Sequence, residues 1–248
     1  MNQQTLFLAW HDKRLTREWF PVGRLDVGAD GKTYRFRYIR GADLATKRAG
    51  FAPLIDFPEL GRSYESCVLF PLFMNRIMQP HRLDFPEYLR MLDLPQGAKA
   101  ADILKINGGY RATDNFEVFP KIEPRQDGSF ETRFFLQGWQ HINADAKSRI
   151  AQLKPGENLN LAIELTNAIV LVTVQIQTKD YYMIGWAPRY LVTDLVHAIA
   201  SSPSEYKAKV IRVNPAPAPA KQRLLIELTG RWPDYQPMSS GDFELLAA

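Results

Sequence analysis

The chain has 248 residues, of which 46% are hydrophobic and 23% charged, a balance typical of a globular protein rather than a disordered one. Its single cysteine, Cys67, excludes an intramolecular disulfide and a cysteine-based zinc finger. The formal net charge of +4 permits nucleic-acid binding without arguing for it.

The sequence does not predict membrane insertion. A spanning helix needs about 20 apolar residues in a row, whereas the longest apolar runs, such as 168–174, have the length of a strand. The first residues have no basic leader before their short apolar patch, so no secretory signal is expected. We therefore expect the protein in the cytoplasm of its host cell.

The N-terminal half begins with strand-forming runs at 6–12, 19–27 and 33–40, which predict a β meander. The tetrapeptide Ala29-Asp30-Gly31-Lys32 predicts the hairpin turn between the last two runs. The segments that follow predict helices at 42–50, 67–79, 84–94 and 98–105, and a strand at 115–122. Cys67, at the start of the apolar second helix, is expected to be a buried thiol.

From residue 131 the pattern becomes mainly that of strands. The segment 143–153 predicts a helix or a loop, and 189–200 predicts an amphipathic helix with Leu191, Leu195 and Ile199 on one face. Proline-rich 215–220 predicts a stiff loop. The predicted strands are 131–139, 158–165, 169–177, 181–188, 206–215 and 221–232.

These elements together predict an α+β protein. Residues 1–125 are expected to form an α+β domain, in which helices follow the β meander. Residues 131–232 are expected to form a small OB- or SH3-like β-barrel with one amphipathic helix. Residues 233–248 are expected to be an extended tail.

Two basic clusters could neutralise phosphates, although solvated faces of strands and turns explain them equally well. The first has Asp43 as its only acid, and the second has no acid between its members. Their members are Lys32, Arg35, Arg37, Arg40, Lys47 and Arg48 in the first, and Lys207, Lys209, Arg212, Lys221 and Arg223 in the second.

Several segments of the second half, in order, resemble the HIRAN domain over about residues 131–230. They are Gly138-Trp139 at the end of a strand, Leu153–Glu157 before the next one, Glu164-Leu165-Thr166-Asn167 at an acidic-x-x-Asn turn, and Ile184–Leu191 before the helix. The resemblance implies a barrel related to OB and SH3 folds that binds DNA, in some members the 3′ end of a single strand.

The resemblance also implies where nucleic acid would bind. Aromatic rings can stack on bases, and Lys or Arg can neutralise phosphates. The implied site residues are Trp139, Gln140, His141, Asn167, Trp186, Arg189 and Tyr190, with Lys207, Lys209 and Lys221 from the basic cluster. The chain departs from the family at Ala168–Val170, where Pro and Asp are usual, and at Gln140-His141, where Arg-Tyr is usual, so 3′-end recognition is in question.

The first half is similar, more faintly, to the N-terminal subdomain of HipA-type toxin kinases, through its meander and the segment Pro71–Pro80. No kinase core accompanies it, because no Gly-rich loop with a catalytic Lys is present. The polar segment Gly108–Asp114 could be a phosphate- or partner-binding turn, or equally a capped connection.

No catalytic constellation stands out. The four histidines are not spaced as metal ligands, and the chain contains no P-loop or dinucleotide fingerprint. We therefore expect a non-catalytic protein without cofactor or metal that binds DNA strands or ends, with RNA as a further possible ligand. The alternative is a protein-interaction module in a toxin–antitoxin or phage-defence system; an enzyme with an unrecognised site is a third reading.

Overall fold

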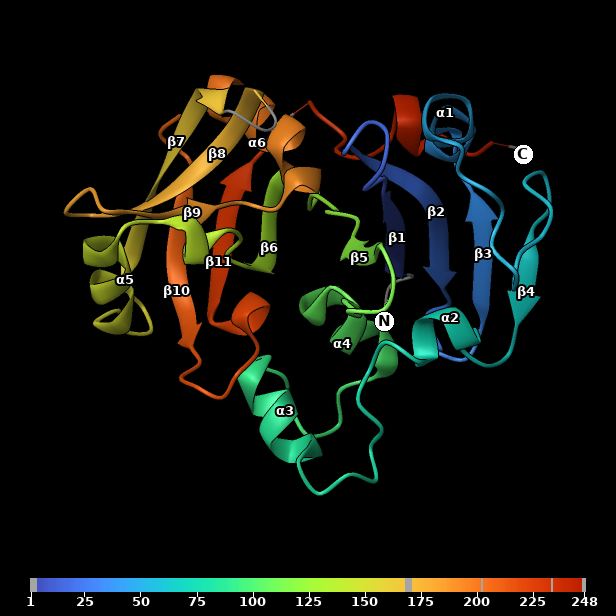
Figure 1. Ribbon diagram of the computed structural model, residues 1–248, viewed down its shortest axis with the longest axis horizontal. Helices are drawn as coiled ribbons and strands as arrows, with labels where there is room; N and C mark the ends of the chain where they lie inside the picture. Colours follow the sequence, from blue (N-terminus) through green and yellow to red (C-terminus); the bar gives the residue numbers. More distant parts are fainter. Residues whose placement is uncertain (1–3, 168–170, 202, 233, 247–248) are drawn as a thin grey trace. The chain divides into compact units, whose positions relative to one another are not determined.

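Strand-forming runs separated by helices fold into an α+β structure in the computed structural model of the protein (Figure 1). The structure describes residues 4–167, 171–201, 203–232 and 234–246, and within these ranges it has two antiparallel sheets and six α-helices. The chain forms two compact units. Unit 1 contains residues 1–89, 94–121 and 237–248, and unit 2 contains residues 90–93 and 122–236.

The predicted meander is confirmed in the five-stranded sheet of unit 1, which has the order β4-β3-β2-β1-β5. Leu6 of β1 pairs with Leu25 of β2, which in turn pairs with Phe36 of β3, so apolar side chains of three strands share one face. The strands are β1 (Gln4–His11), β2 (Trp19–Val27), β3 (Tyr34–Tyr38), β4 (Tyr64–Ser66) and β5 (Phe116–Pro120).

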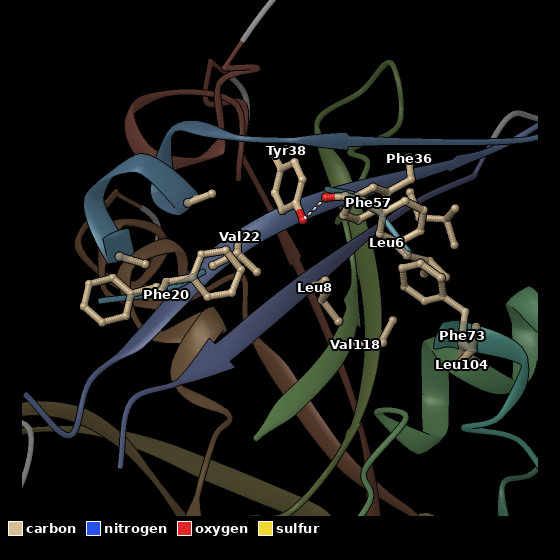
Figure 2. Close-up of a cluster of buried hydrophobic side chains, with 14 of the residues drawn as sticks. Leu6, Leu8, Phe20, Val22, Phe36, Tyr38, Phe57, Phe73, Leu104 and Val118 are labelled. Carbon is tan, nitrogen blue, oxygen red and sulfur yellow. Dashed lines mark hydrogen bonds between the residues drawn. The ribbon is translucent and has the colours of Figure 1, made fainter. Parts of the chain in front are cut away.

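The core of unit 1 combines aliphatic and aromatic side chains (Figure 2). The rings of Phe36 and Phe57 stack with centroids 4.0 Å apart. Tyr38 is buried among them and keeps its hydroxyl satisfied, donating to the Phe57 carbonyl at 2.8 Å and accepting from the Leu54 N–H at 2.7 Å. Burial of the hydroxyl raises the pKa of Tyr38 to about 12. Buried polar groups generally need such partners, so the network fixes residues 51–57 against the sheet.

Three predicted helices of this half are confirmed with shifted ends: α1 (Arg40–Ala49), α3 (Phe85–Met91) and α4 (Ala100–Asn107). Glycines in the left-handed conformation follow two of them, Gly50 after α1 (φ 70°) and Gly108 after α4 (φ 72°). Glycine adopts this conformation without a Cβ penalty, and its N–H satisfies a carbonyl of the last turn.

The predicted helix at 67–79 is wrong. Only α2 (Pro71–Met74) forms, and Cys67 is exposed rather than buried. The physical reason lies at Pro71, which disfavours helical geometry for the preceding residue and therefore sets the start of the helix. Phe73 is nevertheless buried in the core. The apolar pattern therefore predicted the burial of this side chain but not the backbone conformation of the segment.

The segment Gly108–Asp114 has a structural role. Arg76, whose side chain is almost fully buried, donates to Asp114 at 2.6 Å and to the Gly109 carbonyl at 2.8 Å. Asp114 also accepts the N–H of Phe116. The second of the two readings, a capped connection, therefore accounts for Gly109 and Asp114.

The expectation of an extended tail at 233–248 is wrong for the residues that the structure describes. A 3₁₀ turn, η3 (Gly241–Phe243), lies beside α1 (Figure 1), and Leu245 forms a bridge to Ile39. The Phe243 ring meets the Phe7 ring edge-on at 4.8 Å. These apolar side chains are partly buried by packing on the first sheet, which an isolated tail could not achieve. Residues 233 and 247–248 lie outside the described ranges.

Unit 2 is built on a six-stranded antiparallel sheet with the order β6-β11-β10-β7-β8-β9. The helices are α5 (Ala144–Ala151) and α6 (Arg189–Ser201), and α6 lies against β8 (Figure 1). The segment 143–153, for which the sequence predicted either a helix or a loop, thus contains a helix. The strands are β6 (Ser129–Phe135), β7 (Asn158–Asn167), β8 (Leu171–Thr178), β9 (Met183–Trp186), β10 (Lys207–Val213) and β11 (Leu224–Arg231); 3₁₀ turns are η1 (Trp139–His141) and η2 (Ala220–Gln222). Residues 168–170, part of the predicted third strand, lie outside the described ranges.

A closed barrel is not found in the described part of unit 2. The edge strands β6 and β9 share no ladder there; what joins them is one isolated bridge between Gln137 and Trp186. Closure of a barrel requires continuous pairing of the edges, so the observed architecture is a six-stranded sheet whose two edges meet at one point.

The helix α6 covers the sheet with Leu191, Leu195 and Ala198, which are buried. Its apolar face also contains a carboxylate, Asp194, which is buried and accepts a hydrogen bond from the Tyr235 hydroxyl at 2.7 Å. This bond anchors Tyr235 on α6. The Tyr235 ring contacts Trp232, which stacks on Phe130 of β6 with centroids 3.8 Å apart. Within the described ranges, no helix has the length and apolarity needed to cross a bilayer.

Candidate functional site

The bridge between the edge strands brings two predicted site segments together. Trp186 and Gln137 exchange two backbone hydrogen bonds, each 3.0 Å long. Gly138 then turns under the Trp186 ring in the left-handed conformation, with φ 69°. A Cβ at Gly138 would lie 2.6 Å from Trp186 Cε3, closer than atoms can approach, so only glycine fits here.

A polar cluster surrounds the edge of the Trp186 ring. The indole N–H donates to Glu164 Oε2 at 2.8 Å, and the Asn167 amide donates to the same oxygen at 3.2 Å. The hydrogen bond from Trp186, together with those from Asn167 and Gln175, holds the pKa of Glu164 below its usual range against the effect of burial. The carboxylate is therefore ionised at neutral pH, and it orients the half-buried indole.

Trp139 lies in η1, directly after Gly138, and its ring is partly exposed. Its indole N–H donates to the Ala220 carbonyl at 2.7 Å, which ties η1 to η2. Lys221 of η2 is therefore next in sequence to a residue that contacts Trp139. Gln140 and His141 are exposed in the same turn, and their side chains approach each other to 3.4 Å.

Arg189 is exposed and is the first residue of α6. Its side chain has no carboxylate partner in the part of the chain that the structure describes. The N-terminus of a helix carries partial positive charge, so a cation there is unfavourable by about 0.3–1 kcal/mol unless an anion compensates it. Tyr190, which follows, is half-buried. We name Trp139, Trp186 and Arg189 the tryptophan site.

Lys207 and Lys209 do not join the tryptophan site. Lys207 is paired with Thr229, near the end of β11. Trp139 lies near the opposite end of that strand, which begins at Leu224. Lys209 forms an ion pair with Glu227 at 2.6 Å, and Glu227 also pairs with Arg133 at 2.7 Å. Burial raises the pKa of Glu227, but these two cations outweigh it and bring the pKa below its usual value.

Most members of the two basic clusters are neutralised by acids distant in sequence or on an adjacent turn. Arg212 pairs with Asp93 at 2.7 Å. In the first cluster every member except Lys32 has a carboxylate partner: Arg35 with Glu65, Arg37 with Asp26, Arg40 with Glu244, Lys47 with Asp43 and Arg48 with Glu18. Apart from Lys47–Asp43, which lies within α1, charge counts along the chain miss these pairs, because the acids come from other elements.

The sequence interpretation did not include three residues that build the site: Gln137, Gln175 and Ala220. Gln137 and Ala220 contribute through backbone atoms, which leave no signal in side-chain chemistry. Gln175 pairs with Trp186 across β8 and β9. The family-departure positions Ala168–Val170 lie outside the described residues. Within those residues, no group of three or more His, Cys, Asp and Glu side chains is placed to hold a metal ion.

Comparisons with known proteins add little to this geometry. No family model matches the chain, and no curated protein matches it. A solved structure of a protein from Lactobacillus plantarum is similar at 15% identity and a TM-score of 0.31, over 42% of this chain and 100% of that one. A likeness at this TM-score carries no argument, so the resemblance to the HIRAN domain stays a prediction.

Proposed function

We propose that unit 2 is a non-catalytic nucleic-acid-binding unit that holds DNA single strands or ends at the tryptophan site. The observation that carries the proposal is the convergence of segments distant in sequence. Trp139 follows the glycine that lies under the Trp186 ring, and Arg189 begins α6 three residues after Trp186. Two partly exposed rings and an uncompensated cation match the bases and phosphates of one strand.

The proposal includes a HIRAN-like arrangement of the sheet. The Gln137–Trp186 bridge would stand where a barrel of that family closes. Glu164 and Asn167 would orient Trp186 rather than meet the ligand directly, because their polar atoms already engage each other and the indole.

Fluorescence anisotropy with a labelled 20-nucleotide oligothymidine tests the site. Trp139→Ala should weaken binding by about 1–3 kcal/mol, the usual worth of one stacked base, and Trp139→Phe should retain most of the affinity. Arg189→Gln should also weaken binding, whereas Lys207→Gln, the same charge change at the other end of the sheet, should not. Equal effects of Arg189→Gln and Lys207→Gln would contradict the assignment.

A protein partner is the second candidate, and one observation favours it. The β7–β8 hairpin exposes apolar side chains: Leu165 is 68% exposed, and Ile163 and Val172 are also open to solvent. Exposed apolar clusters often mark protein contacts. In a pull-down from native cells, Leu165→Asp should no longer retain the partner protein, and its oligonucleotide binding should be unchanged. If Leu165→Asp instead retains the same proteins and binds less nucleic acid, the result counts against this candidate.

A further inference from the structure

The turn between β1 and β2 presents three cations without carboxylate partners. We name residues 12–18 the basic loop. Lys13, Arg14 and Arg17 are exposed, and none of their side chains forms an ion pair within the described part of the chain. Neither acid of the loop pairs with them, because Asp12 is turned inward onto backbone N–H groups and Glu18 pairs with Arg48 at 3.1 Å.

The basic loop is held in one conformation by its own acid. Asp12 is only 3% exposed, and its carboxylate accepts the N–H groups of Arg14, Leu15 and Thr16 at 2.9, 3.0 and 2.6 Å. The Thr16 hydroxyl donates to the same carboxylate. A surface whose backbone is fixed before binding loses less conformational entropy when a ligand arrives.

The backbone at Arg17 gives a second, independent observation. Its φ is 58°, a left-handed conformation that disfavours any residue with a Cβ. Glycine would fit this position with less strain, and yet the chain has arginine there. Strained positions of this kind cluster at functional sites.

An aromatic pair stands at the base of the basic loop. The rings of His11 and Trp19 are stacked, with centroids 4.6 Å apart and planes within 5°. These residues are paired across β1 and β2, so they flank the loop on both sides. A stacked aromatic pair at the base of a basic loop suits a polynucleotide, whose bases can stack on rings while its phosphates meet cations.

We propose that the basic loop is a second nucleic-acid-binding surface, in unit 1, that contacts the phosphate backbone of a polynucleotide. A membrane surface is a less suitable ligand for the loop. Its three cations are fewer than the four to eight typical of lipid-binding clusters, and Leu15 is the single exposed apolar residue of the loop that could insert into a bilayer. The proposal does not depend on the tryptophan site, because every residue that carries it belongs to β1, β2 and their turn.

The test is a salt series of oligothymidine binding with the full-length chain. The triple variant Lys13→Gln, Arg14→Gln, Arg17→Gln should flatten the plot of log K against log salt by a slope of about 2, for three phosphate contacts. The control variant Arg35→Gln, Lys47→Gln, Arg62→Gln removes the same charge from cations that have carboxylate partners. An equal change in both variants would overturn the proposal by showing an effect of net charge alone.

A third variant separates binding from folding. Arg17→Gly should leave the unfolding midpoint unchanged or raise it, since glycine tolerates the backbone conformation, and should weaken binding with a slope lower by about 0.7. A lowered midpoint with unchanged binding would mean that Arg17 is structural, and would overturn its place in the surface.

The proposals for the tryptophan site and for the basic loop can be contradicted independently of each other. If Arg189→Gln and Trp139→Ala weaken binding while the triple variant does not, the basic loop is excluded and the tryptophan site stands. The reverse pattern supports the loop and contradicts the proposed function of unit 2. Binding of the triple variant is also compared on vesicles containing phosphatidylserine; a loss confined to vesicles would overturn the choice of nucleic acid.

Discussion

The carboxylate of Asp12 organises the turn between β1 and β2 through hydrogen bonds that are stronger while it is ionised. Backbone hydrogen bonds from Thr16 and Arg14 lower the pKa of Asp12 from 3.8 to about 2. A lowered folded-state pKa means that the stabilisation is present above pH 3.8 and is lost as the pH falls through about 2.

Asp12→Asn should therefore lower the free energy of unfolding at pH 7, and the difference from the parent protein should shrink between pH 4 and pH 2. Urea unfolding followed by circular dichroism at pH 7, 5, 4 and 3 measures it. Asp56→Asn removes an exposed carboxylate and serves as the control. A difference that stays constant over this range would mean that the Asp12 hydrogen bonds do not depend on its charge.

Gly138 tests the packing under Trp186. Gly138→Ala places a methyl group 2.6 Å from the ring in addition to the left-handed backbone cost, and should destabilise unit 2 by about 2–4 kcal/mol. Gly156→Ala is the matched control, because Gly156 is also left-handed and has no atom within 4 Å of its Cβ position. Thermal unfolding should show a smaller loss for Gly156→Ala; equal losses would mean that the ring contact contributes nothing.

At the scale of elements, the Tyr235–Asp194 hydrogen bond holds Tyr235 against α6. Tyr235→Phe removes the donor from a buried carboxylate and should cost about 1–3 kcal/mol in the free energy of unfolding. Tyr181→Phe, at an exposed tyrosine, should cost almost nothing. A loss below 0.5 kcal/mol for Tyr235→Phe would show that solvent replaces the bond, on the scale of ordinary surface substitutions.

Elements with regular periodicity could be predicted from the sequence, and those decided by single residues could not. The alternation in β3 and the apolar face of α6 predicted both elements within a few residues. The segment 67–79 was predicted wrongly, because its apolar pattern outweighed Pro71. The buried Asp194 interrupts the predicted face of α6, and its partner Tyr235 lies 41 residues away.

At the scale of the whole molecule, unit 1 is completed by the end of the chain. Leu245 bridges to Ile39, Phe243 packs on Phe7, and Leu246 donates its N–H to the Tyr38 carbonyl. Truncation after residue 236 should therefore destabilise unit 1 more than unit 2. Hydrogen exchange measured by mass spectrometry should show faster exchange in β1 and β3 and unchanged exchange in β10 and β11; the opposite pattern would contradict the division into units.

The α+β class and most of the elements followed from local pattern, whereas β4, the sheet orders and the charge balance did not. The cations of both clusters lacked nearby acids in the chain, but Glu65, Asp93, Glu227 and Glu244 reach them in the fold. The convergence of Trp139 with Trp186 likewise rests on backbone pairing at Gln137, which side-chain types do not encode.

The most direct measurement of the proposed function is the response of the five tryptophan indole N–H signals in a ¹⁵N-labelled sample titrated with oligothymidine. The signals of Trp139 and Trp186 should shift with the added strand, and that of Trp232, which is 2% exposed, should not. A shift of Trp19 alone would place binding at the basic loop. Unchanged signals from both Trp139 and Trp186 at saturating oligonucleotide would contradict the tryptophan site.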